Sequence, residues 1–417
     1  MPRKEHEADL SASYHLALET RLASRSRYAH LTLILLSSLL IVSLGLGLCF
    51  LPHEEFSPEE NRMLATLPQP SFDALIDGSL TRELSDFCAD QFPLRSIFIA
   101  TKAGTELALL KQENNGVLLG RDGYLIKRSH ITDATYTALS SNADAIRRFG
   151  DALVTEGIPF DVAIVPRSVD INVSKLPALY PEEDAAAVWE RLQAECAAQG
   201  VTYLSLTEPL RACAEAGEQV WFRTDHHWTA RGAYEAYLAL ADTLGYEPYP
   251  LSDFTEETVS QAFFGTTYAS AGMRWTEADT LSLMRYEGDE DVVTEIVEGG
   301  QTVRSIEGLY DTEALATHDQ YSVFLGGTST HIRIRSTVET ERPVLLIVKD
   351  SYAQSLSPFL ARHFDLVLLD PRTFKTANGT VSALLSDYAP DRVLLLYGID
   401  TLCDSASLRV LTLGLGQ

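Results

Sequence analysis

The stretch VLLIVKDSYAQSLSPFLARHF (344–364) decides the fold class, because it joins a buried strand directly to a helix. Residues 344–348 are all aliphatic, which is typical of a strand covered on both faces within a parallel sheet. A polar turn (350–352) follows, and a helix is predicted from about Ala353. This order of strand, turn and helix predicts one unit of an α/β fold.

Other short apolar runs repeat this arrangement along the chain. Helical segments lie between them, near 141–156 and in 183–200, so the strands are predicted to run parallel. The runs are IPFDVAIVP (158–166), VTYLSL (201–206), FDLVLLD (364–370) and DRVLLLYG (391–398). We therefore expect a three-layer α/β/α domain built around a parallel sheet.

A different pattern appears between about 251 and 340, where apolar and polar residues alternate. The segment DVVTEIVEGGQTVRSIEG (291–308) predicts a hairpin that turns at Gly299 and Gly300. We expect this part of the chain to form a β-rich insertion in the α/β domain.

Composition and charge limit the classes of function. A chain of 417 residues, 46% of them hydrophobic, can bury a core large enough for an enzyme. The net charge of −25, from 33 basic and 58 acidic residues, repels nucleic acid and anionic lipid surfaces. We therefore expect no nucleic-acid partner.

One uncharged run, LTLILLSSLLIVSLGLGLCFL (31–51), is long enough to cross a bilayer as a helix of about 30 Å. A cleavable signal peptide is the alternative, but its apolar region is normally only about 7–15 residues long. Three arginines precede the run and the acidic segment HEEFSPEE (53–60) follows it. Because basic flanks stay in the cytoplasm, a single-pass membrane protein with its main domain outside the cell is predicted.

This reading divides the chain into four parts. They are a cytoplasmic tail (1–30), a transmembrane anchor (31–51), a stalk or collar region (52–119) and the α/β domain (120–417). The stalk is rich in proline and ends in a helical stretch that includes FIATKAGTELALL (98–110).

The five cysteines do not suggest a catalytic or metal site. Cys49 lies in the apolar run, and the other four show no metal-ligand spacing. A disulfide between Cys196 and Cys213 and a pair of free buried thiols both remain open. We expect no cofactor and no bound metal.

Candidate catalytic residues first appear in WFRTDHHWTARGAY (221–234), which joins a short extended segment to a helix. Asp225 and His227 are two positions apart, so an extended or turn backbone places both side chains on one side. Asp225 can then hold the imidazole of His227 in one tautomer. His226 is expected to point elsewhere, and Trp228 either walls the site or anchors the helix.

Ser351 is the second part of this prediction. In open α/β sheets reactive residues gather at the carboxyl ends of strands, and Ser351 lies at such an end with a helix amino terminus behind it. His227 can take the proton of its hydroxyl. The alternatives are a helix cap for Ser351 and a capping or metal-binding role for the Asp-x-His pair. The two motifs together favour a Ser-His-Asp triad.

Several segments together resemble the DHHW family of bacterial membrane-anchored proteins. Through it the chain is similar to the alginate O-acetyltransferase group, whose domain is similar to SGNH hydrolases. The matching segments are EENRMLATLP (59–68), DQFPLRS (90–96), GRDGYLI (120–126), TDHHWTARGAY (224–234), YSVFLGG (321–327) and IVKDSYAQSLSPFL (347–360).

This resemblance implies a nucleophile at Ser351, a general base and acid at His227 and an orienting carboxylate at Asp225. It also implies a polysaccharide acceptor and a multi-span membrane partner that delivers the acyl group. SGNH enzymes place an Asn in the oxyanion hole, and the matching segments do not assign one here, since Thr328 follows the two glycines where an amide is expected.

The residues considered for the oxyanion hole or for substrate contact come from both motifs and from the end of YSVFLGGT (321–328). They are Gly327, Thr328, Tyr352, Trp228 and His226.

The first functional hypothesis is therefore an extracytoplasmic serine O-acyltransferase or esterase acting on a cell-surface or exported polysaccharide. Metal-dependent phosphoester hydrolysis is the second, because Asp-His-His also resembles a metal-ligand run. A non-catalytic envelope or polysaccharide-assembly protein with an SGNH-like fold is the third.

Overall fold

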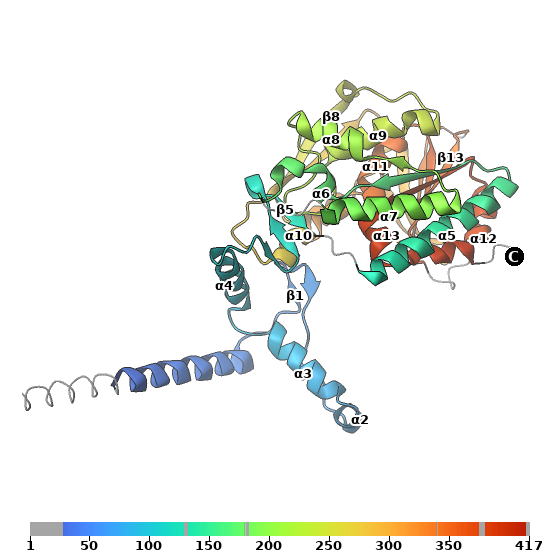
Figure 1. Ribbon diagram of the computed structural model, residues 1–417. Coiled ribbons are helices and arrows are strands. Elements are labelled where there is room, and N and C mark those ends of the chain that lie inside the picture. Colours follow the sequence, from blue (N-terminus) through green and yellow to red (C-terminus); the bar gives the residue numbers. More distant parts are fainter. Residues whose placement is uncertain are drawn as a thin grey trace, which may run out of the picture. The chain divides into compact units, whose positions relative to one another are not determined.

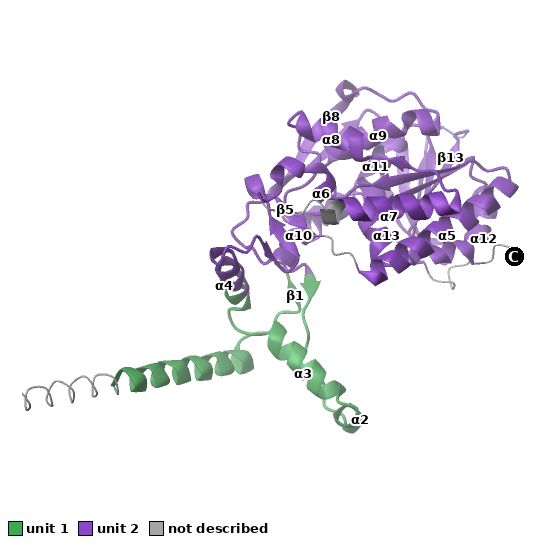
Figure 2. Cartoon of the chain, viewed as in Figure 1, with its two compact units in different colours: residues 1–57, 62–98 green, residues 58–61, 99–417 purple. Residues whose placement is uncertain are grey.

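The computed structural model describes residues 28–128, 132–178, 180, 183–339, 341–374 and 380–413. Most of the expected cytoplasmic tail therefore lies outside the described residues. The chain divides into two compact units (Figure 2), with residues 1–57 and 62–98 in unit 1 and residues 58–61 and 99–417 in unit 2. Residues 99–119, which the sequence placed in the stalk, belong to unit 2.

Unit 1 contains an apolar helix, Tyr28–Phe50, with a mean hydropathy of 2.5. Its length and composition are sufficient to cross a membrane, although a signal sequence near an N-terminus has the same properties. The remaining elements of unit 1 are β1 (Phe56–Ser57), β2 (Arg62–Met63), α2 (Phe72–Ile76), α3 (Ser79–Asp90) and the start of α4 (Arg95–Ala108). Arg62 pairs with Asp90 of α3 through two hydrogen bonds of 2.8 and 2.5 Å.

The core of unit 2 is an eight-stranded sheet with the order β11-β10-β12-β14-β13-β15-β6-β7. Its last five strands are parallel, as the sequence predicted. They are β6 (Phe160–Val165), β7 (Leu204–Ser205), β13 (Val344–Lys349), β14 (Asp365–Leu369) and β15 (Arg392–Gly398). Each of the apolar runs that suggested a parallel sheet forms one of these strands.

The insertion extends this sheet with antiparallel strands, so the sheet is mixed rather than wholly parallel. Strand β12 (His331–Ser336) pairs antiparallel with β14, and β10 (Val292–Glu298) and β11 (Gln301–Glu307) follow. The hairpin between β10 and β11 turns at Gly299 and Gly300, as predicted, because both glycines adopt positive φ angles. On the side away from β13, the backbone N–H and C=O groups of β14 would be unpaired without a further strand. Strand β12 pairs with them, and in this way the insertion joins the main sheet.

Smaller sheets and short helices complete unit 2. Two antiparallel sheets are formed by β3 (Glu113–Asn114), β4 (Val117–Leu119) and β5 (Leu125–Lys127), and by β8 (Phe254–Phe263) and β9 (Asp279–Tyr286). The short helices are α6 (Ser168–Ile171), α10 (Thr266–Ala271), η1 (Arg121–Gly123), η2 (Val173–Lys175), η3 (Leu251–Asp253), η4 (Asp289–Asp291), η5 (Thr312–Ala316) and η6 (Gln320–Val323).

Helices cover both faces of the main sheet (Figure 1), as expected for three layers. One face carries α8 (Thr207–Glu215), α9 (Ala230–Leu244) and α11 (Tyr352–Leu360). The other carries α5 (Asp133–Thr155), α7 (Glu183–Gln199), α12 (Val381–Tyr388), α13 (Ile399–Asp404) and η8 (Ser407–Thr412). Along β13 the side chains alternate between the two cores, with Leu345 and Ile347 on the first face and Leu346 and Val348 on the second.

The two buried cysteines lie on opposite sides of this sheet. Cys196 of α7 belongs to the core of one face and Cys213 of α8 to that of the other, and both are free thiols. Burial raises the pKa of Cys196 to about 11, so its thiol stays protonated and unreactive. Of the two possibilities that the sequence left open, the structure has the free thiols.

Candidate active site

Ser351 lies at the carboxyl end of β13, in the turn that leads into α11. Its backbone is helical (φ −70°, ψ −16°), and its side chain makes no capping hydrogen bond to the helix. The Ser351 Oγ lies 2.7 Å from Nε2 of His227 instead. The hydroxyl is therefore not used as a helix cap, and a potential base lies next to it.

Asp225 completes a continuous hydrogen-bonded line. Its Oδ1 accepts from the backbone N–H of His227 at 2.9 Å and lies 2.5 Å from His227 Nδ1. Asp225 is only 2% exposed, and His227 is also buried. The line from carboxylate through imidazole to hydroxyl is the arrangement that activates a serine nucleophile. The catalytic roles of these three residues stay a prediction.

The second oxygen of Asp225 is held by the insertion. Its Oδ2 accepts from the backbone N–H of Thr266 at 2.7 Å and from the Thr266 hydroxyl at 3.0 Å. Burial on its own would raise the pKa of Asp225. A positive charge on His227, the hydrogen bond with its side chain and the bond from the Thr266 N–H outweigh burial and lower that pKa well below its ordinary value. Asp225 is therefore ionised at neutral pH.

A second buried carboxylate shapes the turn that carries Asp225 and His227. Asp279, at the start of β9, accepts from both the backbone N–H and the hydroxyl of Thr224 at 2.7 Å. It also accepts from the backbone N–H of Arg223 at 3.1 Å. These bonds hold the backbone one residue before Asp225.

Thr266, Gly265 and Asp279 were not predicted from the sequence. All three lie in the β-rich insertion, about 40 or more residues from the DHHW segment. No local pattern distinguishes them from other hydroxyl, glycine and carboxyl residues, because their importance comes only from contacts with Thr224 and Asp225.

A substitution at Gly265 tests whether the insertion holds the Asp225 carboxylate in place. A Cβ at Gly265 would lie 2.1 Å from Asp225 Oδ2, while the φ of −92° is open to any residue. Gly265→Ala should therefore displace the carboxylate without straining the backbone, and we expect any turnover that depends on Ser351 to fall roughly 100-fold, as displacements of about 1 Å can cause.

The control for this variant is Gly104→Ala in α4, where the nearest neighbouring atom lies 3.9 Å from the added Cβ. Steady-state kinetics and thermal unfolding should be measured on both proteins. Equal activity of Gly265→Ala and the wild type would contradict the role of this contact.

His226 does not point away from the site, contrary to the sequence prediction. Its ring centroid lies 3.8 Å from that of His227, and its Nδ1 lies 2.6 Å from the Thr266 hydroxyl. The segment forms bends instead of a strand, so neighbouring side chains do not alternate. The His226 side chain is 37% exposed, and partial burial, followed by the charge of His227, lowers its pKa.

Tyr352 and Trp228, two of the predicted contact residues, are buried beside the site and do not line its cavity. The Tyr352 N–H donates to Asp350 Oδ1 at 3.1 Å, and its hydroxyl donates to the His226 carbonyl at 2.8 Å. Trp228 Nε1 donates to the Ser355 hydroxyl at 2.8 Å. Both residues join the DHHW segment to the β13–α11 region.

Tyr321 also positions the histidine. Its ring stacks on the His227 imidazole with centroids 4.0 Å apart and planes 7° apart. Its hydroxyl lies 3.0 Å from the Ser355 hydroxyl. The stacked ring restricts the imidazole plane and keeps Nε2 directed at Ser351.

A cavity of about 240 Å³ opens onto Ser351. The predicted residues Gly327, Thr328 and His226 line it, as do Gln354 and Arg372, which were not predicted. Two hydrogen bonds from the Arg372 guanidinium to the buried Asp370, of 2.9 and 2.6 Å, fix its position. The cavity thus brings together a serine hydroxyl, an imidazole and a fixed cation.

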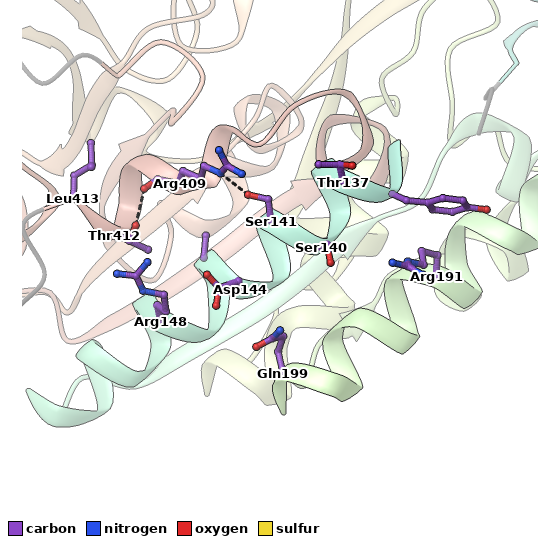
Figure 3. A pocket seen from close by; sticks show the side chains of 12 residues that line it. Thr137, Ser140, Ser141, Asp144, Arg148, Arg191, Gln199, Arg409, Thr412 and Leu413 are labelled. Carbon is purple, nitrogen blue, oxygen red and sulfur yellow. Dashed lines mark hydrogen bonds between the residues drawn. The ribbon is translucent and has the colours of Figure 1, made fainter. Parts of the chain in front are cut away.

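A larger cavity of about 760 Å³ lies among α5, α7 and η8 (Figure 3). Its lining includes Arg148, Arg191, Arg409 and Ser141, and the Arg409 Nε donates to the Ser141 hydroxyl at 2.6 Å. It shares no lining residue with the cavity at Ser351, and no histidine is among the residues that line it. A serine in this cavity has no imidazole base to activate it.

Among the described residues, the group of side chains that could hold a metal ion is the same Asp-His-His run. The ligand atoms of Asp225, His226 and His227 all lie within 4.8 Å of one another. Both Asp225 oxygens and both His227 nitrogens already take part in hydrogen bonds with protein groups. A metal here would have to displace these bonds, so the arrangement fits proton transfer better than metal binding.

Comparisons with known proteins agree with this fold. The family described as "SGNH hydrolase-like domain, acetyltransferase AlgX" matches residues 117–331. Probable alginate O-acetylase AlgJ from Pseudomonas fluorescens is 27% identical over 190 residues, 45% of this chain and 48% of the relative. The protein of the same name from Pseudomonas syringae pv. tomato is 28% identical over 197 residues, 46% of this chain and 50% of the relative. The chain thus matches about half the length of these relatives.

Solved structures share the architecture at lower identity. A DHHW family protein from Eubacterium siraeum superposes with a TM-score of 0.58 at 20% identity and covers 73% of this chain and 98% of its own. PatB1 from Bacillus cereus superposes with a TM-score of 0.55 at 19% identity and covers 70% and 98%. At these identities the comparison concerns the fold.

Proposed function

This chain belongs to the SGNH hydrolase-like family of the acetyltransferase AlgX domain, and on that basis we propose that it is a serine O-acyltransferase that modifies polysaccharide hydroxyl groups. The observation that carries the proposal is the 2.7 Å contact between Ser351 Oγ and His227 Nε2, with Asp225 behind the imidazole. A deacylating esterase would use the same side chains, and the difference lies in whether water or a sugar hydroxyl accepts the acyl group.

In the first half-reaction the Ser351 oxygen attacks the acyl carbonyl while its proton passes to His227 Nε2. The bond to the leaving oxygen then breaks, and that oxygen takes the proton from His227. In the second half-reaction the acceptor hydroxyl gives its proton to His227 and attacks the acyl group, and Ser351 recovers a proton as its ester bond breaks. The Asp225 carboxylate stabilises the imidazolium in both steps.

A polysaccharide acceptor is supported by the relatives, which are named probable alginate O-acetylases. We propose in addition that a multi-span membrane protein supplies the acyl group. The acidic net charge of −25 fits a domain that works in solution beside the membrane.

We propose that the helix Tyr28–Phe50 anchors the chain in the cell membrane. Arg21, Arg25 and Arg27 precede this helix and acidic residues follow it, which supports a cytoplasmic N-terminus and an outward-facing α/β domain. In this arrangement the part of unit 1 that follows the helix, residues 52–57 and 62–98, would form the connection between the anchor and the domain.

The proposal is tested by trapping the acyl-enzyme. The full-length chain in detergent micelles should be incubated with p-nitrophenyl acetate, quenched in acid and digested for mass spectrometry. We expect acetyl on the peptide that contains Ser351, and its loss in His227→Ala. Acetylation of other residues alone, or equal labelling of Ser351 without His227, would favour the alternative of a non-catalytic envelope protein.

A further inference from the structure

Gln354 lies one helical turn after Ser351 in α11 and lines the same cavity. Residues three apart on a helix share a face, and helical side chains lean toward the amino end. The long side chain of Gln354 therefore extends back toward the turn that carries Ser351. Gln354 is only 1% exposed, so its amide is almost withdrawn from water.

The amide nitrogen of Gln354 is buried without a hydrogen-bond partner among the described residues. The other buried polar side chains of α11 are satisfied. The Ser355 hydroxyl accepts from Trp228 Nε1, and the Ser357 hydroxyl donates to the Ala353 carbonyl at 2.7 Å. Since an unsatisfied buried donor destabilises a protein, an apolar residue would suit this position better unless a ligand accepts the bond.

Two other donors near the nucleophile are less available. The N–H of Tyr352, at the amino end of α11, already donates to Asp350. Asn61 also lines the cavity with a side-chain amide, but it is partly exposed and can bond to water. Gln354 is the amide that combines burial, an open donor and a place beside the nucleophile.

Resting on the proposed acyl-transfer function, we propose that Gln354 Nε2 donates a hydrogen bond to the acyl oxygen of the substrate while Ser351 is acylated and deacylated. When Ser351 Oγ bonds to the carbonyl carbon, the electron pair of the C=O double bond moves to oxygen and the Ser351 proton moves to His227. The negative oxygen accepts from Gln354. As the electron pair returns, the bond to the leaving oxygen breaks and that oxygen takes the proton. Gln354 thus fills the role for which the sequence offered no asparagine.

The test compares Gln354→Leu and Gln354→Glu with the wild-type full-length chain in detergent, using p-nitrophenyl acetate as the acyl donor. Both variants keep a similar volume and lose the amide donor. We expect kcat to fall roughly 100- to 1,000-fold with little change in KM, because the bond forms in the transition state. Gln354→Leu should also unfold at an equal or higher temperature than the wild type, since it removes an unsatisfied buried amide.

Ser357→Ala is the matched control, because it removes a buried hydroxyl on the same helix that does not line the cavity. It should lose some stability and keep its kcat. If Gln354 has only a structural role, Gln354→Leu should give the reverse result: its unfolding temperature should fall, and its kcat should stay within about threefold of the wild type. That result would overturn the inference.

Two further variants, Ser351→Ala and Asn61→Ala, distinguish a failure of this inference from a failure of the proposed function. If Ser351→Ala abolishes turnover while Gln354→Leu and Gln354→Glu keep it, the inference fails and the proposed function stands. If Ser351→Ala keeps full turnover, both fail. A loss of kcat in Asn61→Ala, with none in the Gln354 variants, would assign the oxyanion bond to Asn61 and overturn the proposal for Gln354.

Discussion

Ser351→Ala is expected to lower kcat for acyl transfer by a factor of about 10⁴ to 10⁶, the largest effect of any single substitution in this chain. The hydroxyl 2.7 Å from His227 Nε2 is the only atom in this arrangement that can form the acyl-enzyme bond, and alanine removes it. A residual rate above the uncatalysed reaction should persist, because the cavity and its hydrogen-bond donors remain. Pre-steady-state kinetics with p-nitrophenyl acetate should show that the burst is lost.

The control for Ser351→Ala is Ser141→Ala. Ser141 lines the larger cavity of Figure 3 and its hydroxyl also takes part in a single side-chain hydrogen bond, with Arg409 Nε. The chemical change is identical, but no imidazole is involved, so turnover should match the wild type. Comparable losses in both variants would point to a general loss of folding and would count against the nucleophile.

Asp225→Asn should lower kcat by a factor of about 10⁴ while leaving the fold intact. The Asp225 carboxylate accepts a hydrogen bond from His227 and stabilises its positive charge, whereas a neutral amide favours the wrong imidazole tautomer. KM should change much less than kcat, because the loss falls on the imidazolium that forms only as the reaction proceeds. Steady-state kinetics at neutral pH checks this result, and a kcat within tenfold of the wild type would remove Asp225 from the mechanism.

Asp225→Asn should also change how the unfolding free energy depends on pH. The pKa of Asp225 in the folded protein lies well below its ordinary value, so ionisation of this group stabilises the folded state at any pH above about 4, the unfolded pKa. This contribution is lost as the pH falls from there through the lower folded pKa. The difference in unfolding free energy between wild type and Asp225→Asn should therefore be constant from pH 7 to 5 and shrink below pH 4. Urea unfolding at each pH measures it, and a difference that grows on acidification would contradict the lowered pKa.

Local sequence patterns determined the secondary structure well. The aliphatic run 344–348 became β13, the alternating segment around Gly299 and Gly300 became a hairpin, and the apolar run beginning at residue 31 became a helix. These features depend on the periodicity of neighbouring side chains and on turn chemistry, which act over a few residues. The parallel arrangement of five strands follows from the helices between them.

The candidate site could be predicted only in part. The spacing of Asp225 and His227 is local, and the place of Ser351 after a buried strand follows from a general property of α/β sheets. The expectation that His226 points elsewhere assumed an extended backbone, but the turn held by Asp279 brings its ring beside His227. Such a turn depends on a carboxylate 55 residues away.

By itself the sequence determined the α/β class, the five parallel strands, the hairpin at Gly299 and Gly300, the apolar helix and the residue types able to form a triad, because each is written in short-range patterns. Only the tertiary structure decided that the insertion extends the sheet, that Cys196 and Cys213 face opposite cores, and that Thr266 holds Asp225. It also decided which buried amide is left without a partner next to Ser351. The physical reason is that these features arise from contacts between residues far apart in the chain, whose distance depends on the order of strands in the sheet.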